Sequence, residues 1–359
     1  MFPSSVLLIW SSKSGSGKTP RVSIPAPFPD PFVGQSVPRV TVLAGGDSPE
    51  RDISLASGHA VATAMRELGE EVREIDPAEI PVSKCDWMAG DVVLLALHGP
   101  GGEDGTIQAD LDSLGVPYTG CGVGVSRLAF SKSRAKRCFA SAGVPTPDAI
   151  VLERGFDARA AAELVSRCGL PLVVKPDAQG SSLGVRLGET PGEFSDAITQ
   201  AFLLGSRVLV ERAVAGEEWS VGMLDAWPLP AMVVETPGKL FDFEAKYLDE
   251  RTKVSFPEMV PGSTAERVVE VSRRACEAIG TRGLVRVDLR VDASGSPWVL
   301  EINSIPGLTS HSLVPQAAAR LGLSLGQLAR RMIGSTLTGP RGWHIRQDQM
   351  RRRCELSVS

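Results

Sequence analysis

Two apolar runs separated by a helical stretch constrain the fold of the N-terminal part of the chain most strongly. Residues 40–44 (VTVLA) and 91–97 (DVVLLAL) are apolar almost throughout, and residues 54–68 between them have helical character. Strands without polar alternation are typical of a parallel sheet that helices cover on both faces. The pattern therefore predicts a parallel α/β unit. Because ligands of such units bind at the carboxyl ends of the strands, we expect Glu50 and His98 to lie at that edge.

The rest of the chain contains further strand and helix signals and no internal repeat. The pattern Ser263-x-x-Glu266 is a capping box, which predicts the start of a helix. Residues 1–38, rich in Ser, Gly and Pro, are predicted to be a flexible leader, and residues 336–359 a mobile tail. Strands are predicted at 172–175, 208–211, 219–224, 231–235, 284–291 and 297–302, and a further helix at 133–142.

The composition excludes several classes of protein. The 38 basic and 42 acidic residues give a formal net charge of −4, so no overall positive field attracts a nucleic acid. No segment approaches the roughly 18 apolar residues of a membrane span, and no signal peptide is recognisable. The six cysteines lack the spacing of a zinc site or a disulfide framework, which favours a reducing compartment. We expect a cytoplasmic protein that binds neither nucleic acid nor membranes.

Oxygen ligands gather on the two strands predicted at 284–291 and 297–302. Asp288 lies on the first strand, and Glu301 and Asn303 lie at the end of the second. On neighbouring strands, three such oxygen donors would converge, which suits Mg²⁺ bound to a nucleotide. The alternative is a solvent-facing surface on which the acidic residues pair with Lys or Arg.

Two glycine-rich loops follow predicted strands. Lys175 ends a buried strand before the loop 179–184 (QGSSLG), which can direct backbone N–H groups and an ammonium toward phosphate oxygens. Residues 98–105 contain four glycines in eight residues, which lets the backbone approach a ligand closely. Glycine-rich loops are also common as ordinary hairpin and surface turns, so each loop alone leaves both interpretations open.

Short motifs occur in a fixed order along the chain: residues 45–51 (GGDSPER), 97–106 (LHGPGGEDGT), 174–176 (VKP), 180–184 (GSSLG), 243–247 (FEAKY) and 300–312 (LEINSIPGLTSHS). Together they resemble the motifs of D-alanine:D-alanine ligases, and the resemblance covers residues 39–335. It implies an α/β protein with an ATP-grasp fold, preceded by a parallel α/β subdomain. The implied parts are an N-terminal substrate-binding subdomain (39–127), a central ATP-grasp subdomain (128–213) and a C-terminal ATP-grasp subdomain with the metal site (214–335).

The resemblance implies a reaction and its cofactors. In that family ATP phosphorylates the carboxylate of one D-alanine, and the amine of a second D-alanine displaces phosphate to form the dipeptide, a peptidoglycan precursor. Two Mg²⁺ or Mn²⁺ ions bridge phosphate oxygens and offset their charge. By resemblance, the metal ligands are Asp288, Glu301 and Asn303. The implied ATP-binding residues are Lys132, Lys175 and Lys246 at the phosphates, and Glu211, Val214 and Glu218 at the ribose and adenine.

The two D-alanine molecules have implied contacts of their own. Glu50 matches the carboxylate that pairs with the ammonium of the first D-alanine, and His98 matches another contact to that substrate. Ser312 matches the contact to the carboxylate of the second D-alanine, and Leu313 lines the same pocket. The alternatives are that Glu50 only begins a helix and that His98 is a satisfied structural histidine.

The implied catalytic residues act on developing charge and on water. Arg286 and the backbone N–H of Gly307 match the groups that stabilise the tetrahedral intermediate. Ser181 and Tyr247, together with Glu50, match residues that hold the loop over the closed site. Such a lid excludes water, which would otherwise hydrolyse the acyl phosphate.

Two alternatives stand beside this interpretation. The second substrate is D-lactate or D-serine, or the chain is a silent nucleotide-binding module. Tyr247 favours an amine as the second nucleophile, because a relative that uses D-lactate can carry Phe there. Ala213 and Val285 stand where relatives often have aromatic residues, which predicts looser packing around the nucleotide. The family also implies a homodimer.

Overall fold

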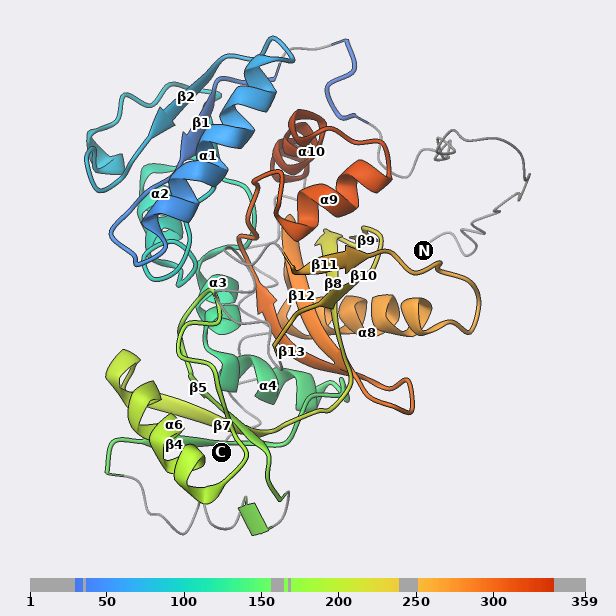
Figure 1. The fold of residues 1–359 in the computed structure, drawn as a ribbon. Helices are drawn as coiled ribbons and strands as arrows, with labels where there is room; N and C mark the ends of the chain where they lie inside the picture. Colours follow the sequence, from blue (N-terminus) through green and yellow to red (C-terminus); the bar gives the residue numbers. More distant parts are fainter. Residues whose placement is uncertain (1–29, 35–36, 156–164, 167–168, 239–250, 339–359) are drawn as a thin grey trace.

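The computed structural model describes residues 30–34, 37–155, 165–166, 169–238 and 251–338. Within these residues the strands form three sheets. In Figure 1 the N-terminal sheet lies at the upper left, a sheet from the C-terminal half lies in the centre, and a sheet from the middle of the chain lies at the bottom. No helix in the same residues is long and apolar enough to cross a membrane.

The N-terminal sheet is parallel, as predicted. Its strands β1 (Val40–Leu43), β2 (Val72–Ile75) and β3 (Val92–Leu95) lie in the order β2–β1–β3. Helix α1 (Arg51–Arg66) packs on one face and α2 (Thr106–Leu114) on the other, which explains why β1 and β3 lack polar alternation. The edge strand β2 was not predicted from the sequence. A short 3₁₀ helix, η1 (Val82–Lys84), lies between β2 and β3.

The sheet from the middle of the chain is antiparallel and carries one helix on its apolar face. Helix α6 (Pro191–Leu204) begins with a capping box of Thr190 and Glu193 and packs through Phe194 and Ile198. The strands predicted at 172–175 and 208–211 are confirmed. In sheet order the strands are β4 (Ala149–Glu153), β7 (Arg207–Arg212), β5 (Leu172–Pro176) and β6 (Arg186–Gly188).

The central sheet is also antiparallel, and the strands predicted for this region are confirmed. The helix predicted from its capping box is confirmed as well, since the Ser263 hydroxyl accepts a hydrogen bond from the Glu266 N–H at 3.1 Å. In sheet order the strands are β11 (Lys253–Ser255), β10 (Met232–Glu235), β8 (Glu217–Leu224), β12 (Leu284–Val291) and β13 (Pro297–Asn303), with β9 (Trp227–Pro228) paired to β8.

Along β12, one face of the central sheet is apolar, and the other is polar at Arg286, Asp288 and Arg290 and apolar at Leu284, where it joins the core of the N-terminal lobe. Val285, Val287 and Leu289 of β12 point into a core that α3 (Val123–Phe130), α4 (Lys132–Ser141) and α8 (Thr264–Ile279) cover. Because side chains alternate along a strand, the residues between them project from the opposite face. That polar face carries the predicted metal ligands.

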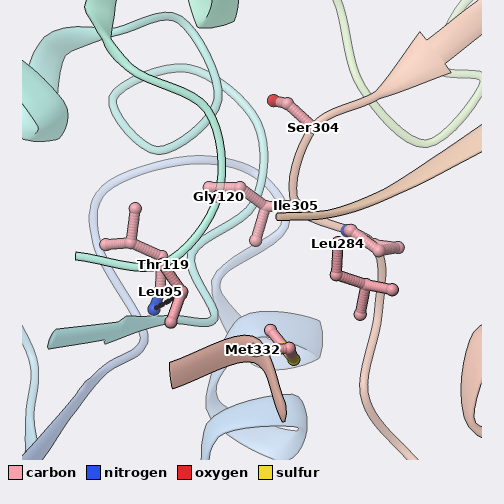
Figure 2. Close-up of a pocket in the computed structure, with 8 residues that line it drawn as sticks. Leu95, Thr119, Gly120, Leu284, Ser304, Ile305 and Met332 are labelled. Carbon is pink, nitrogen blue, oxygen red and sulfur yellow. Dashed lines mark hydrogen bonds between the residues drawn. The ribbon is translucent and has the colours of Figure 1, made fainter. Parts of the chain in front are cut away.

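The N-terminal lobe and the central sheet meet through two C-terminal helices. Helix α9 (Leu313–Arg320) packs on β8, and α10 (Leu325–Thr338) packs on α1 and β3. Figure 2 shows a pocket at this junction, with Leu95 and Thr119 on one side, Leu284 and Ile305 on the other, and Met332 of α10 below. The predicted subdomain boundaries remain a prediction.

Part of the predicted leader packs on the folded chain. Phe32 and Val37 are buried in the core beside α10. Arg330 of α10 pairs with Asp30 at 3.0 Å and donates a hydrogen bond to the Phe32 carbonyl at 2.9 Å. We expected flexibility through residue 38, but Phe32 supplies enough apolar surface to hold residues 30–34 against the helix.

Candidate active site

The polar face of the central sheet arranges its side chains in cross-strand rows. Successive rows on β12 are two residues apart, roughly 7 Å. A β-bulge between Asp288 and Leu289 shifts the register, so that Glu301 lies opposite Asp288. The rows therefore run in one line along the face. They consist of Arg286 with Gly222 and Asn303, Asp288 with Ser220 and Glu301, and Arg290 with Glu218 and Trp298.

The middle row and its neighbour contain the three predicted metal ligands. Asp288 is buried and accepts hydrogen bonds from Arg286 at 2.8 and 2.7 Å and from Ser220 at 2.8 Å. Asn303 directs its side-chain oxygen to the N–H of Ile305 at 3.0 Å. No group of three His, Cys, Asp or Glu residues in the described part of the chain is placed to hold a metal. Two carboxylates and one amide oxygen on paired strands nevertheless fit Mg²⁺, which completes its shell with water and phosphate.

Lys132 connects the glycine-rich loop 179–184 to the polar face of the central sheet. Its ammonium lies 3.1 Å from the Glu301 carboxylate and donates to the Gln179 carbonyl at 2.7 Å. Asp177 positions Lys132 by capping α4, because it accepts hydrogen bonds from the Ser133 N–H at 2.7 Å and the Ser131 hydroxyl at 2.9 Å. Lys132, which is predicted to bind phosphate, is therefore held beside Glu301, a predicted metal ligand.

Lys175 and Glu211 form a buried pair on adjacent strands, 2.5 Å apart. A second lysine, Lys136 of α4, lies 2.8 Å from the same carboxylate. Burial acts to raise the pKa of Glu211, but the two lysines lower it below its usual range. Burial likewise acts to lower the pKa of Lys175, and Glu211 and Glu301 raise it above its usual range. Both predicted ATP-binding residues are therefore charged.

Val214 and Glu218, which are predicted to contact the ribose and adenine, lie beside Arg290 in the third cross-strand row. Arg290 pairs with Glu218 at 2.8 Å and donates to the carbonyl of Val214 at 3.2 Å. The Arg212 guanidinium stacks over the Trp298 ring at 4.7 Å. Arg290 thus joins Val214 and Glu218 in one group.

Glu50 lies between the two glycine-rich loops. It occupies the N-cap position of α1, but its buried side chain makes no cap and instead accepts a hydrogen bond from the Ser181 hydroxyl. A Cβ atom on Gly99 would lie 2.6 Å from the Glu50 carboxylate, and one on Gly180 would lie 2.3 Å from it. Ser181 has φ 48°, a left-handed conformation that is uncommon outside glycine. The loops therefore enclose Glu50 tightly.

His98, the residue before Gly99, is also buried. Burial, and then the charge of Arg286, lower the pKa of His98 to about 4, so its ring is neutral at pH 7. Ser57 lies 3.3 Å from the His98 ring nitrogen and also accepts a hydrogen bond from the Leu308 N–H at 3.3 Å. This contact brings His98 to the segment that contains Gly307.

The predicted pocket of the second D-alanine follows directly. A Cβ atom on Gly307 would lie 2.8 Å from the Ser312 hydroxyl, so a larger residue there would displace that hydroxyl. Leu313 begins α9 and is buried in the core that joins the lobes. Gly307, Ser312 and Leu313 are thus adjacent. Lys246 and Tyr247 lie outside the described residues.

Three buried residues near these groups were not predicted. Glu103 accepts a hydrogen bond from the Gly99 N–H at 2.9 Å, and a Cβ on Gly180 would lie 3.2 Å from it. Glu103 and Asp177 are part of or next to the motifs singled out above, which is a usable signal. Lys136 follows Lys132 by four residues, which places both on one side of α4.

A parallel α/β lobe followed by two antiparallel sheets, with paired lysines and carboxylates between them, is the architecture of the ATP-grasp ligases. The family model "D-ala D-ala ligase C-terminus" matches residues 138–334, and "D-ala D-ala ligase N-terminus" matches residues 83–121. The chain therefore belongs to the D-alanine–D-alanine ligase family, and the predicted family and fold class are confirmed.

Individual relatives agree over nearly their whole length. The D-alanine–D-alanine ligase of Gloeobacter violaceus is 40% identical over 83% of this chain and 99% of its own, and that of Chromohalobacter salexigens is 42% identical over 83% and 94%. Among solved structures, a Bacillus anthracis D-alanine–D-alanine ligase has a TM-score of 0.74 at 32% identity, covering 87% of this chain and 99% of that one. The VanG D-Ala:D-Ser ligase of Enterococcus faecalis has a TM-score of 0.72 at 26% identity, covering 83% and 98%.

Proposed function

We propose that this ATP-dependent ligase joins two D-alanine molecules through a D-alanyl phosphate and releases ADP and phosphate. The observation that carries the proposal is the set of ion pairs on and beside the polar face, Arg286 with Asp288, Lys132 with Glu301 and Lys175 with Glu211, in a chain of this family. The G. violaceus, C. salexigens and B. anthracis relatives carry this activity in their names, and a second B. anthracis structure is described as complexed with ATP. The product would serve peptidoglycan synthesis in the cytoplasm.

The first step requires the substrate carboxylate and the γ-phosphate to approach each other. Glu50 would bind the ammonium of the first D-alanine, and the neutral His98 would contact the same molecule. Lys132, Lys175 and Lys246 would bind the phosphates and offset their charge. Asp288, Glu301 and Asn303 would hold two Mg²⁺ or Mn²⁺ ions, which would supply further positive charge there.

The second step builds negative charge on the acyl carbon's oxygen. Arg286 and the Gly307 N–H would stabilise that oxyanion, and one such donor typically lowers a barrier by about 3 kcal/mol. Ser312 and Leu313 would orient the second D-alanine so that its amine attacks. Ser181, Tyr247 and Glu50 would keep the loop closed and water out.

The identity of the second substrate is the main alternative. The structural similarity to a D-Ala:D-Ser ligase favours testing D-serine, while Tyr247 favours an amine over the hydroxyl of D-lactate. D-Serine also attacks through an amine, so residue chemistry alone does not separate it from D-alanine. A homodimer is the proposed assembly.

The test is phosphate release from ATP and Mg²⁺ in parallel reactions with D-alanine, L-alanine, D-alanine plus D-serine, and D-alanine plus D-lactate. We expect release that depends on D-alanine and a product with the mass of D-alanyl-D-alanine. If the main product instead contains D-serine or D-lactate, that compound is the second substrate, and the proposal of D-alanine in that place is wrong. Arg286→Ala should lower kcat about 100-fold, and an unchanged kcat would contradict the assigned role.

A further inference from the structure

Lys136 is a buried lysine to which the proposed mechanism assigns no role. It projects from α4, and 6% of its side chain is exposed. Its ammonium contacts the Glu211 carboxylate at 2.8 Å, the Thr146 hydroxyl at 2.8 Å and the Pro147 carbonyl at 3.0 Å. All three partners of the ammonium are groups of the protein itself, two through hydrogen bonds and one through an ion pair.

The contacts of Lys136 determine its charge. The Thr146 hydroxyl donates its own hydrogen to the Val299 carbonyl at 2.8 Å, so it accepts one from Lys136. The Pro147 carbonyl also accepts, and the Glu211 carboxylate lies 2.8 Å from the ammonium as its ion-pair partner. Two hydrogen-bond acceptors and one carboxylate around a buried amine favour its protonated form. Burial lowers the pKa of Lys136 below its usual range, and Glu211 opposes that effect only in part.

Lys136, Lys175 and Glu211 form a lysine cluster, and its net charge depends on the Lys136 ammonium. Glu211 contacts Lys175 with one carboxylate oxygen and Lys136 with the other. With both lysines present, the cluster carries one net positive charge in a buried place. With Lys175 alone, Glu211 would neutralise it, and the attraction for a phosphate would fall.

We propose that Lys136 is a positioning residue that shares Glu211 and thereby keeps the charge of Lys175 available to the phosphates of ATP. The inference rests on the proposed function, because it assumes that Lys175 binds phosphate. The same contacts link the cluster to β13: Thr146 binds the Val299 carbonyl, and the Val299 N–H binds the Pro145 carbonyl at 2.8 Å. Lys136 thus also connects the lysine cluster to the strand of Glu301.

The test compares ATP with adenosine, which lacks phosphate, by calorimetric titration and competition in the presence of Mg²⁺. Lys136→Met should weaken ATP binding at least tenfold and change adenosine binding less than threefold. Lys136→Arg, which keeps the charge, should stay within threefold of the wild type for ATP. Thr146→Val, which keeps the ammonium but removes one acceptor, is the matched control and should also stay within threefold.

A double variant separates charge from folding. Lys136→Met/Glu211→Gln restores one net positive charge. Because Glu211 is itself a predicted contact of the nucleoside, adenosine binding measures that loss, and the ratio of ATP to adenosine affinity in the double variant should lie within threefold of the wild-type ratio, even if Lys136→Met alone does not fold. Equal losses for ATP and adenosine in Lys136→Met, or a double variant whose ratio of ATP to adenosine affinity stays at least tenfold below the wild-type ratio, would overturn the proposal. Dipeptide formation by the wild-type protein tests the proposed function separately, because the inference is measured by nucleotide binding.

Discussion

Burial changes the protonation of two side chains near the predicted ammonium site of Glu50. Burial, and then the charge of Glu50, raise the pKa of Glu103 to about 8 from an ordinary value of 4.5. Burial lowers the pKa of His98 to about 4 from 6.5. At neutral pH both groups are therefore largely uncharged. The charge that a substrate would meet there comes from Glu50 and Arg286.

The protonation of Glu103 makes stability depend on pH. The pKa of Glu103 is higher in the folded chain than in the unfolded chain. The contribution of Glu103 to the free energy of unfolding is therefore complete below about pH 4.5 and is lost as pH rises through about 8. Between about pH 6.5 and 8 the free energy of unfolding should fall, by at most about 1.4 kcal/mol per pH unit. Glu103→Gln should flatten this slope, measured by urea unfolding. His98 affects the range below pH 6.5, so it does not interfere, and an equally steep slope in the variant would contradict the assignment.

At the scale of elements, local signals predicted most strands and helices and the neighbouring positions of β12 and β13, but neither the edge strand β2 nor the bulge was predicted. The strand predicted at 284–291 has the bounds of β12, and the capping box marks the start of α8, because alternation and caps are local properties. The edge strand β2 is four residues long and only half-buried, so its sequence carries no apolar run. The bulge that sets Glu301 opposite Asp288 depends on β12–β13 pairing, which no single segment encodes.

The same limit applies to the site. Side chains on shared motifs, such as Glu50 and Ser181, were placed by resemblance, and the structure brings these two into contact. The contact between Lys136 and Glu211 joins a helix to a strand 75 residues away, counted from their positions. Neither local pattern contains that information, because it arises only when α4 packs beside the sheet.

The loop 179–184 allows a test of how closely it encloses Glu50. A Cβ at Gly180 would lie 2.3 Å from the Glu50 carboxylate, so Gly180→Ala must displace one of them. We expect KM for D-alanine to rise at least tenfold, with a smaller change in KM for ATP, in steady-state kinetics. Gly192→Ala in α6 is the control, because its Cβ would meet open space. Equal changes in the two variants would refute the tight enclosure.

At the scale of the whole molecule, the candidate site draws on every sheet. Glu50 comes from the N-terminal lobe, Ser181 from the sheet in the middle of the chain, and Arg286 from the central sheet. Helix α10 holds the first of these lobes against the central sheet, since its residues join a core with β1, β3 and β12. Contacts that fix α10 therefore help to hold the N-terminal lobe, which carries Glu50, against the central sheet.

Residues 30–34 provide one such contact and a final prediction. Phe32 is 8% exposed in the core beside α10, and Arg330 holds it through its carbonyl, through its ring at 5.6 Å and through Asp30. Removing a buried Phe side chain typically costs about 3–5 kcal/mol, so Phe32→Ala should lower the free energy of unfolding by roughly that amount in urea. Val33→Ala is the control, because Val33 is 78% exposed and should change stability by less than about 0.5 kcal/mol. If Phe32→Ala were as stable as Val33→Ala, the packing of residues 30–34 on α10 would contribute nothing measurable to the stability of the core that joins the lobe to the central sheet.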